Sequence, residues 1–133
     1  MILNHDKKFI FLKTRKTAST SIEIYLERLS FPNTEVQEYQ PQKISHNIIV
    51  GARLKDMSNM YEYYNHMPAL EVAKKIGEER FYSYFKFCVL RNPFDKLVSD
   101  FYWALFLKKI SPPLDFLLIK KMFKNFIVSK KII

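Results

Sequence analysis

The residues best suited to chemistry lie in the stretch TRKTASTS, residues 14–21. It follows an apolar block, FIFL, and leads into a segment in which apolar residues recur at helical spacing. A helix N-terminus presents unpaired N–H groups and the positive end of the helix dipole, so it favours an anion. Lys16 adds a mobile point charge, and hydroxyls of the first helical turn add donors: Ser19, Thr20 and Ser21. The turn predicts a phosphate or sulfate site.

This turn is not an ordinary nucleoside triphosphate loop. The G-x-x-x-x-G-K-[ST] pattern needs glycines, and the only glycines of the chain are Gly51 and Gly77, so a P-loop ATPase is disfavoured. The alternative interpretation is that the hydroxyls only cap a helix while Arg15 and Lys16 face water. The turn alone does not separate the two interpretations.

A second basic turn follows another apolar run, FKFCVL at 85–90. Arg91 comes directly after this run and can grip an anion through two parallel hydrogen bonds, to which Ser99 can add a third. The alternative is a salt bridge at the strand end and a serine on the helix surface. Together with the first turn, the second turn indicates a ligand with two separated anionic groups.

The expected elements bring these turns together. We predict strands at 8–13, 47–51 and 85–90, helices at 18–29 and 68–76, a helix from Asn92 and Pro93 onward, and a loop at 30–42. Strand, basic turn and helix occur twice, which predicts an α/β fold with a P-loop-like parallel sheet and flanking helices, small or incomplete. Ligands of parallel sheets bind at the carboxyl ends of the strands, so both turns are expected at one edge.

The helix at 18–29 should bury an apolar stripe and leave its charged residues on the surface. The stripe is Ile22, Tyr25, Leu26 and Leu29, and the charged residues are Glu23, Glu27 and Arg28.

Composition limits the other classes. The chain has 133 residues and a net charge of +9, but residues 104–133 hold seven lysines and one acid, so the basic character belongs mainly to the tail. Nucleic-acid binding is therefore disfavoured. One cysteine, Cys88, and no secretory signal or membrane-spanning run predict a cytoplasmic protein. We expect residues 1–110 to form the α/β domain with the two basic turns, and residues 111–133 to form a basic tail.

The tail has apolar residues at helical spacing, namely Ile119, Met122, Phe123, Phe126 and Ile127. This pattern predicts an amphipathic helix, and we favour its docking on the protein's own core. Peripheral membrane contact through the lysines is the alternative. A sheet this small also favours a homo-oligomer.

At this point two motifs, KFIFLKTRKTASTSIE and FKFCVLRNPFDKLVSDFYW, together resemble the PAPS-dependent sulfotransferases of the carbohydrate type, sulfotransferase family 2. PAPS is 3′-phosphoadenosine 5′-phosphosulfate, the sulfuryl donor. The resemblance implies that Lys16 is catalytic and that the first loop surrounds the 5′-phosphosulfate; its residues are Arg15, Lys16, Thr17, Ala18, Ser19, Thr20 and Ser21. It places Arg91 and Ser99 on the 3′-phosphate.

The chain departs from this family at two points. Many members have a proline where this chain has Arg15, and a glycine pair where it has Ala18 and Ser19, which narrows the backbone conformations open to the loop. Members usually continue further beyond Trp103, so the chain resembles a shortened member. A shortened, inactive protein that still binds PAPS or its desulfated product is the alternative to an active enzyme acting on a carbohydrate or other small hydroxyl acceptor.

The acceptor hydroxyl must lose a proton, and His66 is our candidate base, because it lies in a loop before the 68–76 helix and histidine titrates near neutrality. Glu23 is a less favoured base, and a solvated role for either residue is the alternative. No metal is expected, because three scattered histidines and one cysteine lack ligand spacing.

Overall fold

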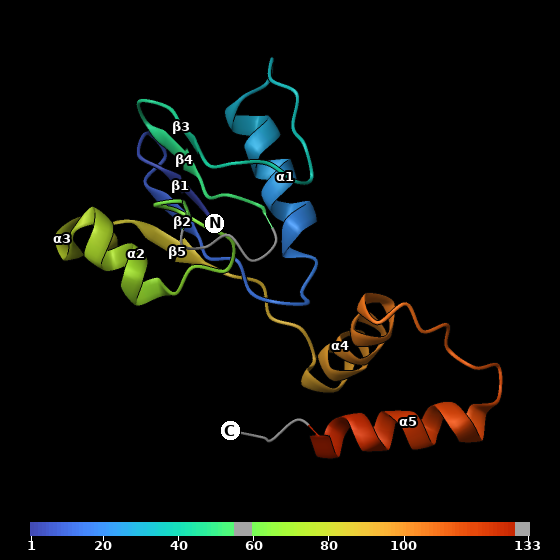
Figure 1. Cartoon of the computed structure of the whole chain (residues 1–133). Helices are drawn as coiled ribbons and strands as arrows, with labels where there is room; N and C mark the ends of the chain where they lie inside the picture. Colours follow the sequence, from blue (N-terminus) through green and yellow to red (C-terminus); the bar gives the residue numbers. More distant parts are fainter. Residues whose placement is uncertain (55–59, 130–133) are drawn as a thin grey trace. The chain divides into compact units, whose positions relative to one another are not determined.

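A computed structural model of the protein describes residues 1–54 and 60–129. The chain divides into two compact units, Met1–Leu90 and Arg91–Ile133. The first unit holds the sheet and three helices, and the second holds two helices (Figure 1). The predicted boundary near residue 110 stays a prediction.

The sheet of the first unit has five strands in the order β3-β4-β1-β2-β5. They are β1 (Ile2–Asn4), β2 (Phe9–Phe11), β3 (Lys43–Ile44), β4 (Ile48–Val50) and β5 (Phe85–Phe87). Three pairings are antiparallel, and β2 with β5 is the parallel one.

The α/β class and the parallel arrangement of β2 and β5, the two strands that precede the basic turns, are confirmed, but the sheet as a whole is mixed and not parallel as predicted. The physical reason is the length of the connections. Four residues join β1 to β2, which allows only a hairpin, whereas parallel strands need a crossover of a dozen or more residues. The connection between β2 and β5 is longer than a dozen residues, so these two strands can pair in parallel. β1 and β3 were not predicted.

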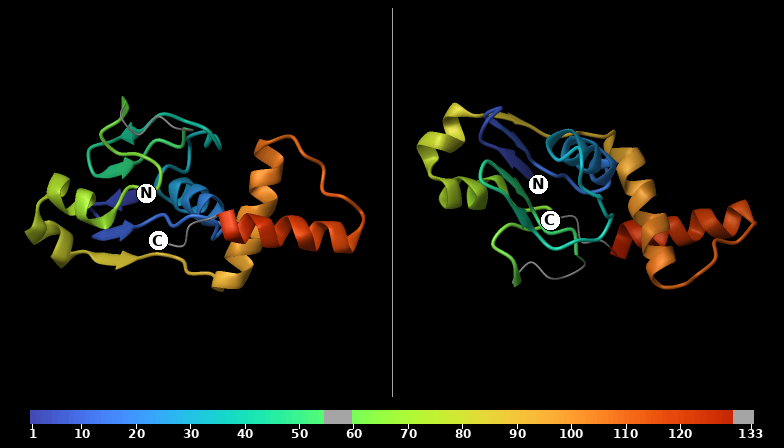
Figure 2. Two further views of the ribbon diagram at one scale, coloured as in Figure 1. Left: turned by 60° about the horizontal axis from the view of Figure 1, so that its bottom comes forward. Right: turned by 90° about the horizontal axis from the view of Figure 1, so that it is seen from above.

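Helices cover both faces of the sheet, as the views in Figure 2 show. These are α1 (Ser19–Ser30), α2 (Ala69–Ile76) and α3 (Glu78–Ser83). Since successive strand residues point to opposite faces, Leu3 and Ile10 pack with residues of α2 and α3, while Ile2 and Phe11 pack with residues of α1. The strand at 8–13 is thus buried on both faces, as its apolar run indicates.

The helix ends follow their sequence signals. Pro68 caps α2, and Gly77 ends it with φ of 89°, in the left-handed half of backbone space that glycine tolerates. Asn92 caps the first helix of the second unit by accepting a hydrogen bond from the Phe94 N–H at 2.9 Å. The helix α3 was not predicted.

The buried face of α1 differs from the prediction. Ser19, Glu23 and Glu27 are buried, while Tyr25 and Leu29 are 63% and 64% exposed. The expectation that both glutamates lie on the surface was wrong, because cationic groups of neighbouring segments pair with them, as described below.

The second unit pairs α4 (Pro93–Leu107) with α5 (Phe116–Ser129). The ring of Phe101 on α4 lies 5.2 Å from the ring of Phe123 and 5.5 Å from that of Phe126, measured between centroids. The tail helix is confirmed, and its predicted apolar face is half-buried. The predicted tail lysines Lys130 and Lys131 lie outside the described residues.

Within the part of the chain that the structure describes, none of the helices combines the length and the apolar character needed to cross a bilayer. Cys88, expected within an apolar block, is exposed at the end of the edge strand β5.

Candidate functional site

The two segments that follow β2 and β5 run side by side. The Leu12 N–H donates to the Phe87 carbonyl at 2.9 Å. One step further, the Thr14 hydroxyl donates to the Val89 carbonyl at 2.6 Å. The expected common edge is confirmed for these segments, since both strands end there and the chain stays paired beyond them.

The two residues of the second motif that are expected to bind an anion lie beyond this pairing. Arg91 is the first residue of the second unit, two positions after Val89, and Ser99 is a half-buried residue of α4. That Lys16 and Arg91 both lie at this edge of the sheet stays a prediction.

The first loop adopts a left-handed backbone without glycine. Lys16 has φ of 60° and Ala18 has φ of 56°, with Thr17 between them. When residues with positive φ alternate with residues of ordinary φ, successive backbone N–H groups point toward one side and form an anion-binding concavity. Each such non-glycine residue costs about 1–2 kcal/mol, and strain of this kind collects at functional sites. The loop therefore keeps the geometry that glycine would favour, at an energetic cost.

Two of the predicted hydroxyl donors serve the loop itself. The Thr14 hydroxyl proton goes to Val89, so the Thr17 hydroxyl, 2.8 Å from Thr14 Oγ1 and 3.2 Å from Thr14 O, directs its proton to Thr14. Ser19 Oγ donates to the same Thr14 carbonyl at 2.5 Å. Thr17 and Ser19 are buried, whereas solvent reaches Thr20 and Ser21. Of the four hydroxyls, Thr20 and Ser21 are thus the better placed for an external anion.

Below this loop, Glu23 joins three cationic groups in the interior. Its carboxylate accepts from the Met1 ammonium at 2.5 Å and from Lys13 Nζ at 2.9 Å, and Arg53 Nη1 lies 3.8 Å away. Burial lowers the pKa of the Lys13 ammonium, although the Glu23 carboxylate opposes the shift. Because Lys13 directly precedes the loop, the pair fixes the point at which the loop leaves the sheet.

Glu27, one turn further along α1, extends the same buried cluster. It accepts from Arg53 Nη1 at 2.5 Å, from Lys43 Nζ at 2.7 Å and from Gln40 Nε2 at 2.9 Å. Burial would raise the pKa of the Glu27 carboxyl, but the hydrogen bonds from Lys43, Gln40 and Arg53 outweigh it and lower the pKa. Four basic groups meet two carboxylates, so basic groups outnumber acidic ones beneath the first loop.

His66 lies against the first loop. Its Nδ1 is 3.1 Å from the Lys13 carbonyl oxygen. A carbonyl only accepts, so Nδ1 carries the hydrogen and Nε2 keeps a lone pair in the neutral ring. Burial lowers the pKa of His66; the bond to Lys13 opposes this, and the charges of Lys13 and Arg15 add to the lowering. The ring is therefore neutral near pH 7, as a base requires.

Asn65, the neighbour of His66, was not singled out from the sequence. Its side-chain oxygen is buried and is, among the described residues, the one buried side-chain polar atom without a hydrogen-bond partner. A buried acceptor of this kind calls for a donor. No sequence pattern marks this residue, because a single asparagine in a loop is commonplace.

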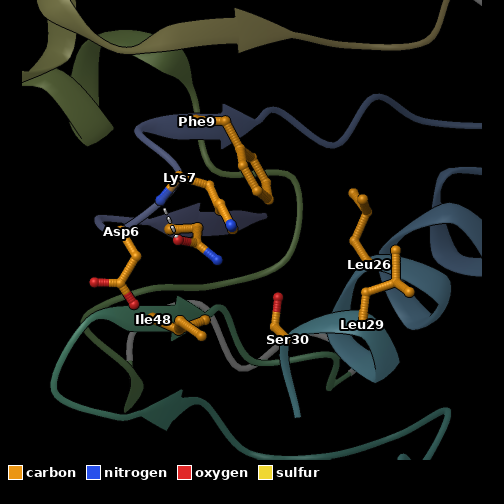
Figure 3. A pocket seen from close by; sticks show the side chains of 8 residues that line it. Asp6, Lys7, Phe9, Leu26, Leu29, Ser30 and Ile48 are labelled. Carbon is orange, nitrogen blue, oxygen red and sulfur yellow. Dashed lines mark hydrogen bonds between the residues drawn. The ribbon is translucent and has the colours of Figure 1, made fainter. Parts of the chain in front are cut away.

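A separate hollow of about 330 Å³ lies at the other end of α1, against the turn between β1 and β2 (Figure 3). Its lining residues are Asn4, Asp6, Lys7, Phe9, Leu26, Leu29, Ser30 and Ile48. A helix of 12 residues is about 18 Å long, so this hollow is remote from the loop at the N-terminus of α1. It is not part of the candidate site.

Comparison with known families now bears on this geometry. A model of the "Sulfotransferase family" matches residues 1–127, a range that contains both motifs and nearly all of α5. The chain belongs to the sulfotransferase family. The resemblance of the two motifs is thereby confirmed. No curated protein and no solved structure gives a significant match to this chain.

The buried charged cluster around Glu23 and Glu27 was not predicted from the sequence. Ser19, Glu23 and Glu27 are spaced four residues apart and share one face of α1. That spacing was the available signal, but a polar stripe is ordinarily solvated. Among the described residues, no three His, Cys, Asp or Glu side chains are grouped so as to hold a metal ion.

Proposed function

We propose that the protein transfers a sulfuryl group from PAPS to a hydroxyl of a carbohydrate or another small acceptor. The observation that carries this proposal is the bond from the Thr14 hydroxyl to the Val89 carbonyl, at 2.6 Å. It ties the residue directly before the proposed phosphosulfate loop, Arg15–Ser21, to the strand end that leads to Arg91. Membership of the sulfotransferase family supports the reaction class.

The donor's two anionic ends fit the residue types of the two motifs. The left-handed loop at Lys16 and Ala18, with the N-terminus of α1, suits the 5′-phosphosulfate. Of the four loop hydroxyls, those of Thr20 and Ser21 can donate hydrogen bonds to the 5′-phosphosulfate. Arg91 and Ser99 are the proposed partners of the 3′-phosphate, which a guanidinium can hold through two hydrogen bonds.

The chemistry requires charge stabilisation and a proton acceptor. Lys16 offsets the negative charge that develops on the oxygen that stays with the departing nucleotide. Nε2 of His66 takes the proton of the acceptor hydroxyl while that oxygen forms its bond to sulfur. The neutral ring and the bond from Nδ1 to Lys13 O, at 3.1 Å, support this role. Asn65 can receive a hydrogen bond from a second hydroxyl of the acceptor.

The second candidate function is binding of PAPS or its desulfated product without turnover. The hydroxyl protons of Thr17 and Ser19 point to Thr14, which leaves fewer donors for sulfonate oxygens than the motif suggests. A protein of this kind would bind the nucleotide and release no sulfated product.

A thermal-shift titration with adenosine 3′,5′-bisphosphate tests binding. A ligand at a hundred times its Kd stabilises the folded protein by about 2.7 kcal/mol. We expect this shift in the parent and in Lys74→Ala, an exposed lysine of α2, and a much smaller shift in Lys16→Ala and Arg91→Ala. Equal shifts in all four proteins would refute the assigned sites. Transfer from radiolabelled PAPS to a panel of sugars then separates the enzyme from the non-catalytic binder.

A further inference from the structure

A connecting segment joins α4 to α5 (Figure 1), and large apolar side chains at its end and in the first turn of α5 are exposed to solvent. Phe116 and Leu117, in the first turn of α5, are 72% and 74% exposed, and Leu114 is fully exposed. Asp115 starts this helix by accepting hydrogen bonds from the N–H groups of Leu117 and Leu118, at 2.8 and 3.4 Å. The cap fixes the start of α5, so the first turn of this helix consists entirely of apolar residues.

Lysine pairs bracket this apolar segment. Residues 108–121 read KKISPPLDFLLIKK, with one acid among four lysines. We call this segment the hairpin tip. Lys120 and Lys121 follow Phe116 and Leu117 by four residues, so they lie on the same sides of α5 about 6 Å further along its axis. All four lysines are exposed.

We propose that the hairpin tip docks on the surface of a membrane that contains anionic lipids. Interfacial segments bury apolar side chains about 5–10 Å deep, at the boundary of headgroups and acyl chains. With Leu114, Phe116 and Leu117 at that depth, the 6 Å offset places Lys120 and Lys121 at the lipid phosphates. This inference does not rest on the proposed enzymatic function.

The docking surface is the tip, not the apolar face of α5. That face packs on α4 through the contacts of Phe123 and Phe126 with Phe101, so it is already occupied. The tip keeps large apolar side chains exposed beside cationic ones, a combination that suits an anionic, partly apolar partner.

Charge distinguishes a membrane from the other partners that an apolar patch can take. A second copy docked tip to tip would bring the lysine pairs of both chains together, and like charges oppose that contact. A nucleic acid would satisfy the lysines but would give Leu114, Phe116 and Leu117 no apolar surface to bury. An anionic bilayer satisfies both sets.

Co-sedimentation of the full chain with lipid vesicles tests the proposal. We expect binding to vesicles of equimolar phosphatidylcholine and phosphatidylglycerol, and much weaker binding to phosphatidylcholine alone. The Lys120→Gln, Lys121→Gln variant should bind about fivefold more weakly for each lysine removed. The Phe116→Ser, Leu117→Ser variant should bind at least about tenfold more weakly, because it loses apolar surface.

Matched controls come from α2 and the segment before it. Lys74→Gln with Lys75→Gln removes the same charge from an exposed adjacent pair, and Met60→Ser with Leu70→Ser removes two exposed apolar side chains. Both controls should bind like the parent.

Three outcomes would overturn the proposal. The first is no binding to the anionic vesicles, and the second is equal weakening by the tip and control variants. The third is a dimer in sedimentation velocity that the tip serines dissociate, with no lipid binding. The lysine variant retains every apolar contact, so it decides the matter even where the serine variant fails to fold.

Discussion

Replacement of Glu23 by glutamine should destabilise the protein strongly. Glu23 is fully buried and accepts from the ammonium groups of Met1 and Lys13, with Arg53 nearby. The amide keeps the shape and one acceptor oxygen but removes the negative charge. The cationic groups then remain in the interior without their counter-charge.

The magnitude follows from these distances. At 2.9 Å and an effective dielectric constant near 20, the pair of Lys13 with Glu23 has a gross Coulomb energy of about 6 kcal/mol. Part of this is regained, because the glutamine oxygen still accepts a hydrogen bond from Lys13. Removal of one partner from a buried pair typically costs about 3–5 kcal/mol, so we expect a loss near about 3 kcal/mol in the free energy of unfolding.

The assay is urea unfolding followed by far-ultraviolet circular dichroism. Trp103, the one tryptophan of the chain, lies on α4, so its fluorescence follows the second unit separately. Glu62→Gln is the matched control, since Glu62 is exposed and such surface changes usually stay within about 0.5 kcal/mol. A Glu23→Gln variant as stable as the Glu62→Gln control would refute the reasoning.

The pH dependence gives a second check on the same variant. Burial already lowers the pKa of the Lys13 ammonium, and Glu23 opposes that shift. Without Glu23 the folded-state pKa falls further, so the folded protein loses that proton more readily than the unfolded chain. The deficit of Glu23→Gln should therefore shrink as the pH rises above neutral. A deficit that grows with pH would contradict the assignment of Lys13 as the stranded charge.

Three further predictions concern the loop and its surroundings. Ala18→Gly should stabilise the protein by about 0.5–1 kcal/mol in the same unfolding assay, because relief of the left-handed φ exceeds the added chain entropy of glycine; Ala104→Gly, inside a helix, should destabilise it. The folded state lowers the pKa of Glu27 below its ordinary value of 4.5, so ionised Glu27 contributes stability at pH values above 4.5. This contribution is lost as the pH falls through the pKa of Glu27 in the folded protein. Glu27→Gln should therefore flatten the acid limb of a stability–pH curve. In the enzyme proposed above, His66→Asn should lower kcat by about a hundredfold or more, while the exposed control His46→Asn should not. Because the pKa of His66 is lowered from 6.5, the midpoint of the acid limb in the pH profile of kcat/KM should lie below pH 6.5.

The sequence by itself determined the local elements and the chemistry of the motifs. Proline and asparagine at helix starts and Gly77 at a helix end place α2 and α4, because caps are local interactions. The apolar run before Lys16 predicts a strand buried on both faces, and the basic, hydroxyl-rich turn predicts an anion site. These inferences need only neighbours along the chain.

Only the tertiary structure decided what the charged side chains meet. Periodicity predicted that Glu23 and Glu27 face water, but Arg53, from 26 residues beyond Glu27, pairs with both. Periodicity likewise did not indicate that the His66 ring bonds to the carbonyl of Lys13, 53 residues earlier in the chain. The physical reason is that a charge is as stable buried as exposed only when a partner is supplied, and that partner comes from a distant segment that local patterns do not specify.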